Sequence, residues 1–151
     1  MKVYRITKAK YSQDLSGTGA KLYGGRWNSK GTAILYTAEN KALAALKSLV
    51  HFDPVLVPKN LKIITIEIPK RAIKNLGQDK LPKGWKSNPV LLELSEIGKK
   101  WVESNSSLAL KVPSVIIPGE YNVLVNPEHK LFSTIKILEQ EDFSFDERLF
   151  E

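Results

Sequence analysis

The stretch YGGRWN, residues 23–28, places an arginine and a tryptophan directly after two glycines. Glycine lets a backbone turn sharply and approach a ligand closely, and successive amide groups at such a turn can bind an anion. An arginine held there presents a planar fork of donors that matches phosphate or carboxylate. The stretch has two interpretations: either the backbone aims Arg26 at an anionic ligand, or Arg26 makes a structural ion pair in a glycine-rich loop.

The residues around this stretch predict a long loop followed by a strand. Residues 11–32 contain five glycines and read as a loop, but the G-x-x-x-x-G-K-[ST] pattern of a P-loop is missing. Tyr36 lies ten positions after Arg26 (36 − 26), near the end of the strand predicted over AILYTA, residues 33–38. An aromatic ring at a strand end can stack on a base or a nicotinamide. A core tyrosine with a satisfied hydroxyl is the alternative.

Hydrophobic patterning predicts a single α+β domain over residues 1–151 with a mixed or antiparallel sheet and two main helices. The clearest strand is LKIITIEIP, in which apolar and polar residues alternate. We expect about six strands and two helices: strands at 3–7, 33–38, 61–69, 108–118 and 132–140, a strand or loop at 120–129, and helices at 38–52 and 89–104. A helical turn is expected over 70–75, and Pro113 is expected at a sheet edge or bulge.

The helix predicted over 38–52 carries an apolar stripe of Leu43, Leu46 and Val50, and Thr37 is the expected N-cap. Lys47 lies off this stripe. The end of the chain is too apolar for a free tail, so we expect it to pack on the body through Phe143, Phe145, Leu149 and Phe150.

Composition excludes several classes of function. The chain has no cysteine and only His51 and His129, so we expect no disulfide, no thiol catalysis and no metal site. No segment approaches the length of a membrane span or a signal peptide, which favours a cytoplasmic location and no membrane partner. The net charge of +7 favours anionic partners. No helix-turn-helix pattern, RNA-binding signature or basic block is present, so no direct contact with nucleic acid is expected.

The stretch VPSVIIPGEYNVLVNPEH, residues 112–129, gathers compact polar groups between prolines. Ser114 lacks the G-x-S-x-G context of a hydrolase nucleophile, so a hydrogen-bonding role is expected for it. Asn122 could join neighbouring loops. His129 is expected to be a loop histidine rather than a general base.

Six blocks in the same order resemble the RES-domain toxins, a family named for an arginine, a glutamate and a serine. The blocks are YRI, LSGTGAKLYGGRWNSKG, ILYTAE, ALAAL with SLVHF, VPSVIIPGEYNVLVNPEH and FDERLF. The resemblance implies an ADP-ribosyltransferase-like fold with a cleft that binds NAD as substrate. It also implies breakage of the nicotinamide–ribose bond, by phosphorolysis, by hydrolysis or by transfer of ADP-ribose to a protein.

The resemblance also implies roles for single residues and a partner. Arg26 would grip the NAD phosphates, and Tyr36 would lie beside the nicotinamide ribose. The other NAD-site positions implied by the resemblance are Trp27, Asn28, Ser114 and Asn122, of which Trp27 and Asn28 would fix the loop that aims Arg26. The implied partner is an Xre-type antitoxin that covers the cleft. Assembly as a homo-oligomer or as a toxin–antitoxin hetero-oligomer stays open.

One position departs from the family pattern. The family glutamate belongs in an ALAALE stretch, but this chain reads ALAALK, with Lys47 eleven positions after Tyr36 (47 − 36). Breaking the glycosidic bond builds positive charge on the ribose, which a carboxylate stabilises and an ammonium repels. Losing one preorganised electrostatic group commonly costs about 2.7–4 kcal/mol, and reversing its sign should cost more. Without the resemblance, Lys47 would be read as an ordinary exposed helix lysine.

Three explanations for Lys47 stay open. The chain is an inactivating variant, or a natural member that kept binding and lost catalysis, or a member in which another carboxylate such as Glu39 or Glu120 substitutes. The first is our expectation, so the sequence predicts an NAD-acting toxin with impaired catalysis. The alternative is a non-catalytic module that binds a nucleotide or a protein in the same cleft. A binder of nucleic acid through net charge is a third, weaker option.

Overall fold

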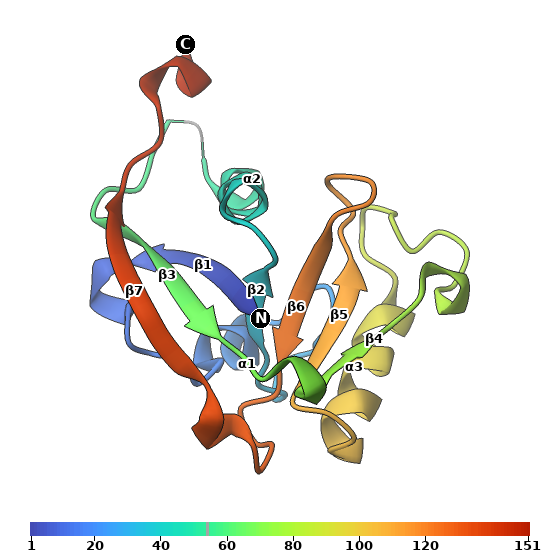
Figure 1. Ribbon diagram of the computed structural model, residues 1–151. Coiled ribbons are helices and arrows are strands. Elements are labelled where there is room, and N and C mark those ends of the chain that lie inside the picture. Colours follow the sequence, from blue (N-terminus) through green and yellow to red (C-terminus); the bar gives the residue numbers. More distant parts are fainter. Residues whose placement is uncertain (54) are drawn as a thin grey trace.

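A computed structural model describes residues 1–53 and 55–151 (Figure 1). The described residues form one mixed sheet of seven strands in the order β4-β5-β6-β2-β1-β3-β7. Only β4 and β5 pair in parallel, and every other neighbouring pair is antiparallel. The strands are β1 (Lys2–Lys8), β2 (Leu35–Ala38), β3 (Leu61–Glu67), β4 (Ile73–Asn75), β5 (Ala109–Pro113), β6 (Tyr121–Val125) and β7 (Lys136–Phe143).

Two main helices accompany the sheet, as predicted. They are α2 (Lys41–His51) and α3 (Leu92–Ser104), and a shorter helix, α1 (Thr18–Tyr23), precedes them. The predicted α+β class with a mixed sheet is therefore confirmed. Among the described residues, no helix has the length and apolar character needed to cross a membrane.

The sheet diverges between β1 and β2. These strands share a single residue pair, Tyr4 with Ala38, whereas β1 and β3 pair along seven positions. The two halves of the sheet separate at this point, with β1, β3 and β7 on one side and β2, β6, β5 and β4 on the other (Figure 1). This divergence opens the space that the candidate site uses.

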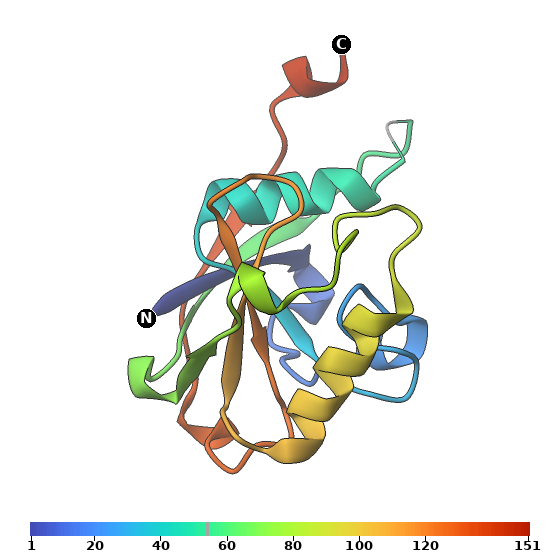
Figure 2. The ribbon, with the colours of Figure 1, turned by 90° about the vertical axis from the view of Figure 1, so that its right-hand side faces the viewer.

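Each main helix covers a different part of the sheet (Figures 1 and 2). α2 packs Leu43 and Ala44 against Ala38 of β2, with Tyr4 and Ile6 of β1 beside them. α3 packs on the β5–β6 half through a cluster of Leu94, Trp101 and Val102 with Trp27, Ile34, Leu110, Val112 and Leu124. The alternating residues of β3 are buried as the sequence indicated, with Ile64 and Ile66 fully enclosed.

The start of α2 differs from the prediction. The N-cap is Asn40, whose side chain accepts a hydrogen bond from the Leu43 backbone N–H at 2.7 Å. Thr37 instead belongs to β2, where its Oγ1 donates to the Val123 carbonyl at 2.7 Å. Thr37 belongs to the sheet and not to the helix because β2 pairs with β6 as far as Ala38. The helix begins only at Lys41.

The apolar stripe of α2 is also narrower than predicted. Leu43 is buried, but the exposed fractions of Leu46 and Val50 are 37% and 65%. Small Ala44 takes the inward position instead, and Val50 and Lys47 border a cleft. The helix is therefore turned so that one face lies over open space rather than over core.

The glycine-rich loop holds structure that the sequence did not indicate. Residues 11–32 contain α1, whose N-cap Gly17 has φ +71°. A Cβ atom at Gly17 would collide with the Ile34 backbone, so only glycine allows this close approach. The count of seven strands also exceeds the expected six, because the three-residue β4 follows the helical turn at Lys70–Ala72.

Pro113 ends β5 rather than breaking it. β5 lies between β4 and β6, but β4 pairs only with residues 109–111, so the missing N–H of Pro113 leaves no bond to β4 unmade. The strand or loop predicted at 120–129 is the shorter β6, followed by a turn. The strand predicted at 132–140 is β7, which begins four residues later.

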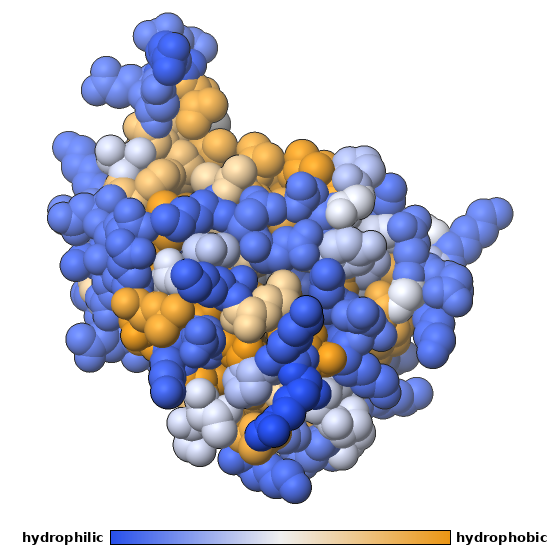
Figure 3. Space-filling view, viewed as in Figure 1, coloured by the Kyte–Doolittle hydropathy of each residue, from blue (hydrophilic) through white to orange (hydrophobic). Residues whose placement is uncertain are grey.

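The C-terminal segment docks in part. Phe145 is buried and makes edge-to-face contacts with Phe52, Phe143 and Phe150, with ring centroids 4.9–6.0 Å apart. Leu149, which we expected to pack, is 58% exposed. The last residues project beyond α2 (Figure 1), and hydrophobic residues gather beneath them, as they do in separate patches lower on the same face (Figure 3).

Candidate active site

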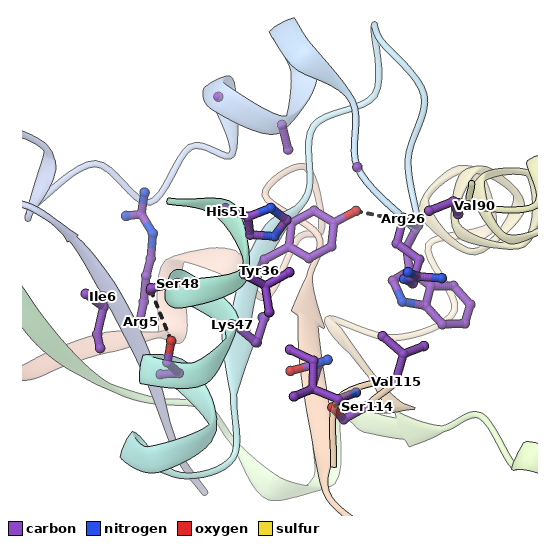
Figure 4. Close-up of a pocket in the computed structure, with 18 of the residues that line it drawn as sticks. Arg5, Ile6, Arg26, Tyr36, Lys47, Ser48, His51, Val90, Ser114 and Val115 are labelled. Atoms are coloured by element: carbon purple, nitrogen blue, oxygen red, sulfur yellow. Dashed lines mark hydrogen bonds between the residues drawn. The ribbon is translucent and has the colours of Figure 1, made fainter. Parts of the chain in front are cut away.

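A cleft of about 590 Å³ opens where the sheet diverges. It is walled by β1, β2, α2, the loop after α1 and the connection from β5 to β6. The lining includes Arg26, Trp27, Tyr36, Lys47, Ser114 and Asn122. The structure thus brings together every residue singled out for the site except Asn28. Figure 4 shows Arg5 and Arg26 on opposite sides, with Tyr36 and Lys47 between them.

Arg26 lies in a tight turn that its neighbours close. The Gly25 backbone N–H donates to the Asn28 carbonyl at 2.9 Å. The Arg26 guanidinium donates from Nη1 to the Trp85 carbonyl at 3.2 Å and makes no ion pair with any described residue. Burial lowers its pKa from the ordinary value, yet an arginine stays charged. The geometry favours an aimed arginine over a structural ion pair.

Tyr36 fastens this turn to the sheet. Its hydroxyl donates to Asn28 Oδ1 at 2.6 Å and accepts from the Trp27 backbone N–H at 3.1 Å. Burial raises the pKa of Tyr36 above its ordinary value, so the phenol stays neutral. The hydroxyl is therefore occupied by the loop, and the ring is the part that faces the cleft.

Asn28 stabilises the arginine loop through hydrogen bonds and does not line the cleft. It is buried, and its Nδ2 donates to the carbonyls of Ala20, Ser29 and Thr32 at 2.8–3.3 Å. Trp27, also buried, reaches the cleft wall with only 2% of its surface exposed.

Lys47 projects from α2 toward the Tyr36 ring. Its Nζ lies 5.8 Å from the ring centroid and 3.5 Å from the Thr37 carbonyl, a long and weak hydrogen bond. Burial lowers the pKa of Lys47 to about 8. It is therefore not the ordinary exposed helix lysine that would be expected without the family resemblance.

No described Asp or Glu lines the cleft. Glu39 accepts from the Tyr121 backbone N–H at 3.2 Å and lies 3.4 Å from Lys111 Nζ. Glu120 accepts from Asn40 Nδ2 at 2.6 Å. Both carboxylates bind groups outside the cleft. The geometry therefore does not favour either one as a substitute for the missing family glutamate.

Ser114 and Asn122 form the wall opposite α2. Ser114 Oγ accepts from the backbone N–H groups of Ile116 and Ile117 at 3.0 and 3.3 Å, so it shapes its own turn. Asn122 Oδ1 is buried and accepts no hydrogen bond from any described residue. A buried acceptor without a donor carries a desolvation penalty.

His129 lies outside the cleft lining and has a structural role. It is buried, its Nδ1 accepts from the Leu131 backbone N–H at 3.0 Å, and its Nε2 lies 3.1 Å from the Asn105 carbonyl. Within residues 1–53 and 55–151, no three His, Asp or Glu side chains are grouped to hold a metal ion.

Sequence reasoning missed Arg5, Ser48 and His51, which also line the cleft. The Arg5 side chain projects from β1, and its Nη1 donates to the Asp14 carbonyl at 2.7 Å. Burial lowers the pKa of Arg5 from its ordinary value. An arginine within the predicted strand VYRIT is visible in the sequence, but nothing local indicates that its side chain lines a cleft. The cleft thus presents Arg5, Arg26 and Lys47 as cationic side chains, which suits a ligand with more than one negative charge.

The sequence pattern of the RES domain matches residues 2–146 of this chain. The chain belongs to the RES domain family. It is 40% identical over 151 residues to the protein named Toxin Res from Yersinia enterocolitica, covering 99% of each chain. It is 38% identical over 141 residues to the Prs ADP-ribosylating toxin of a Sphingobium strain, covering 91% of this chain and 88% of that one.

A solved structure shares the fold of this RES domain. The crystal structure of the M. tuberculosis MbcT–MbcA toxin–antitoxin complex contains a chain that aligns with a TM-score of 0.76. The alignment covers 99% of this chain and 86% of that chain at 18% identity. At this identity the likeness concerns the fold alone.

Proposed function

We propose that this chain is the toxin of a bacterial toxin–antitoxin pair and that its cleft binds NAD as substrate. The reaction would break the nicotinamide–ribose bond and pass ADP-ribose to phosphate, water or a protein. The observation that carries the proposal is the cleft itself, which has three cations, no described carboxylate and an arginine free of ion pairs. The similarity to an ADP-ribosylating toxin supports the same chemistry.

The proposed roles follow from the contacts. Arg26 would bind the pyrophosphate through its free donors, while Tyr36, Asn28 and Trp27 hold the arginine loop in place. The Tyr36 ring and the Asn122 side chain would face the nicotinamide riboside, where the Asn122 carboxamide would bond a hydroxyl or amide group of the ligand. Ser114 would support the same wall.

Lys47 would impair the chemical step. The charge that develops on the ribose during bond cleavage is positive, and an ammonium in this position opposes it. Because no described carboxylate lines the cleft, nothing else on its walls offers the stabilising charge. The substitution would leave binding of the anionic phosphates intact or strengthen it.

The proposal extends to the surroundings of the protein. The partner would be an Xre-type antitoxin that covers the cleft, and the net charge of +7 would speed its encounter with an acidic surface. The toxin would act in the cytoplasm as a single domain over residues 1–151, without metal and without touching nucleic acid. Homo-oligomers and toxin–antitoxin hetero-oligomers are both compatible with it.

The direct test follows NAD loss and nicotinamide release by this chain and by Lys47→Glu, each with and without phosphate. Turnover by Lys47→Glu alone is expected, and dependence on phosphate would identify the acceptor. Equal turnover by both forms would refute a role for position 47. Absence of turnover from both, with NAD still bound, would favour a protein acceptor.

A second candidate is a non-catalytic module that binds a nucleotide or a protein. The absence of a carboxylate among the described cleft residues favours it. Failure of both this chain and Lys47→Glu to bind NAD would support a protein-binding module, and salt-dependent binding of arbitrary DNA would support the nucleic-acid option.

A further inference from the structure

Two walls of the cleft are joined by a group of polar contacts that lies outside the cleft lining. Helix α2 carries Lys47 into the cleft, and the connection from β5 to β6 carries Ser114 on the opposite wall. Figure 4 shows Lys47 on the α2 side and Ser114 and Val115 on the other. The residues just before α2 contact those at the start of β6. We call these four residues the α2–β6 joint: Glu39, Asn40, Glu120 and Tyr121.

Asn40 uses both polar atoms of its carboxamide in this joint. Its Oδ1 accepts from the Leu43 backbone N–H at 2.7 Å and so caps α2. Its Nδ2 donates to Glu120 Oε2 at 2.6 Å. The residue that fixes the start of the helix is therefore also bonded to the segment that leads to the opposite wall.

Glu120 continues the connection into that wall through its main chain. Its carbonyl accepts from the Ser114 backbone N–H at 2.8 Å. Ser114 Oγ in turn accepts from the backbone N–H groups of Ile116 and Ile117, which shapes the turn that forms the wall. Glu120 thus bonds the cap of α2 with its side chain and Ser114 with its main chain.

Glu39 and Tyr121 add two hydrogen bonds beside this contact. The Glu39 N–H donates to the Tyr121 carbonyl, and the Tyr121 N–H donates to Glu39 Oε1, both at 3.2 Å. Lys111 Nζ lies 3.4 Å from Glu39 Oε2, but no described cation lies within ion-pair distance of Glu120. A second carboxylate placed against Glu120 would therefore meet it without a compensating charge.

We propose that Glu120 is a positioning residue for the cleft, which holds α2 against the Ser114 wall through Asn40. Glu120 lies outside the cleft lining, so it acts through the two walls and not on a ligand. Side chains of a binding site must be held within about 0.5 Å of the productive geometry, and a cleft with two walls needs both of them fixed. Only the consequence for NAD rests on the proposed function.

The test changes the charge at the joint and keeps the helix cap. Asn40→Asp places a carboxylate against Glu120, although aspartate caps a helix as well as asparagine does. Glu120→Gln keeps an acceptor for the Asn40 amide. The double variant Asn40→Asp/Glu120→Gln restores the hydrogen bond with donor and acceptor exchanged, because a glutamine amide can donate to aspartate. Asn75→Asp, at an exposed position on β4, is the control that adds the same charge elsewhere.

The first readout needs no ligand. Amide hydrogen exchange measured by NMR reports whether the backbone N–H groups of Ser114 and Tyr121 stay bonded across the joint. Both should exchange about tenfold faster in Asn40→Asp, the equivalent of losing a hydrogen bond to a charged group. The amide of Ile64, buried in β3, should exchange as before, which verifies that the fold is retained.

The other variants decide the cause of this change. Glu120→Gln, the double variant and Asn75→Asp should exchange like the unmodified chain. Unchanged exchange in Asn40→Asp would overturn the proposal. Exchange that stays fast in the double variant would also overturn it, because aspartate at position 40 would then act without Glu120.

The second readout is calorimetric titration of NAD into the same proteins. Asn40→Asp should bind NAD about tenfold more weakly than the unmodified chain, and the double variant should recover the lost affinity, as expected for two residues that act as a pair. Equal affinity in Asn40→Asp and the unmodified chain would overturn the positioning role. If exchange follows the expected pattern but the unmodified chain does not bind NAD, the proposed function fails and the role of Glu120 in joining the walls stands.

Discussion

Tyr36 ties the arginine loop to the sheet through two hydrogen bonds of one hydroxyl. Removing that oxygen in Tyr36→Phe leaves the Trp27 backbone N–H and the Asn28 side-chain Oδ1 without this partner. The free energy of unfolding should fall by about 1–3 kcal/mol, and NAD affinity should fall with it as the loop loosens. Urea unfolding and calorimetric titration measure the two effects.

Tyr23→Phe is the matched control because Tyr23 is 81% exposed on the same segment. It should leave stability and binding unchanged. If Tyr36→Phe behaved like Tyr23→Phe, the hydroxyl would have no part in holding Arg26.

Lys47 should destabilise the fold in a pH-dependent way. Its folded pKa of about 8 lies below the ordinary lysine value of 10.5. Below pH 8 the amine is protonated in both states, and the folded state solvates that charge poorly, so the penalty is fully present. As pH rises from about 8 to about 10.5, the folded amine is neutral first, and the penalty disappears.

Lys47→Met should therefore raise the free energy of unfolding by about 1–2 kcal/mol at pH 7, less than the full shift because the amine borders a cleft. The gain should shrink toward zero near pH 10.5. Urea unfolding at pH 7 and at pH 10.5, in carbon-dioxide-free buffer, measures it. Lys100→Met, at an exposed position, should show no pH-dependent gain. A gain for Lys47→Met that is the same at both pH values would contradict buried charge as its cause.

Helix α3 positions the arginine loop by direct backbone contact. A Cβ atom at Gly98 would collide with the Trp27 carbonyl, so the helix and the loop approach as closely as they do only because this residue is glycine. Gly98→Ala should lower the free energy of unfolding by about 1–3 kcal/mol through forced separation. Thermal or urea unfolding measures this effect.

Gly19→Ala is the opposite control on α1. A Cβ atom there has no neighbour within 4 Å, and alanine favours a helix over glycine by up to about 1 kcal/mol. Stability should stay equal or rise. A loss at Gly19 as large as that at Gly98 would contradict the contact with Trp27 as the cause of the loss at Gly98.

Elements were predictable where local pattern and tertiary environment agree. The residues of β3 alternate between the two faces of the sheet, and the strand pairs with β1 and β7 along its length. The alternating pattern alone therefore predicts this strand. The cap of α2 was not predictable, because Thr37 and Asn40 are both good caps and only pairing of β2 with β6 decides between them. The short α1 and the three-residue β4 depend on the approach of Gly17 to Ile34 and on the neighbouring β5.

The residues of the site likewise divide into those that local sequence marks and those that only the tertiary structure brings into the cleft. Arg26 and Tyr36 could be singled out because glycines and a strand end mark them locally. Arg5 could not, because its place in the cleft depends on how β1 diverges from β2. The lowered pKa of Lys47 likewise depends on burial that appears only when α2 lies over the divergence.

The molecule as a whole is a divided sheet with a cation-lined cleft at its division. Its net charge of +7 attracts anions generally, and a second hollow bordered by Lys8, Lys10 and Lys59 also gathers cations. The cleft differs from that hollow in its two arginines and in its aromatic side chains, Trp27 and Tyr36. We therefore expect NAD to bind at the cleft, and removal of an exposed charge elsewhere should matter little.

The most direct measurement is calorimetric titration of NAD into the unmodified chain, Arg26→Gln and Arg148→Gln. Arg148 is an exposed arginine near the C-terminus whose one ion pair among the described residues is with Asp146. Arg148→Gln therefore removes the same charge at a position away from the cleft. NAD should bind the unmodified chain and Arg148→Gln alike, and about 10–100-fold more weakly to Arg26→Gln, the equivalent of losing a charged hydrogen bond. NAD binding that is absent from the unmodified chain, or equal in all three proteins, would contradict the cleft as an NAD site.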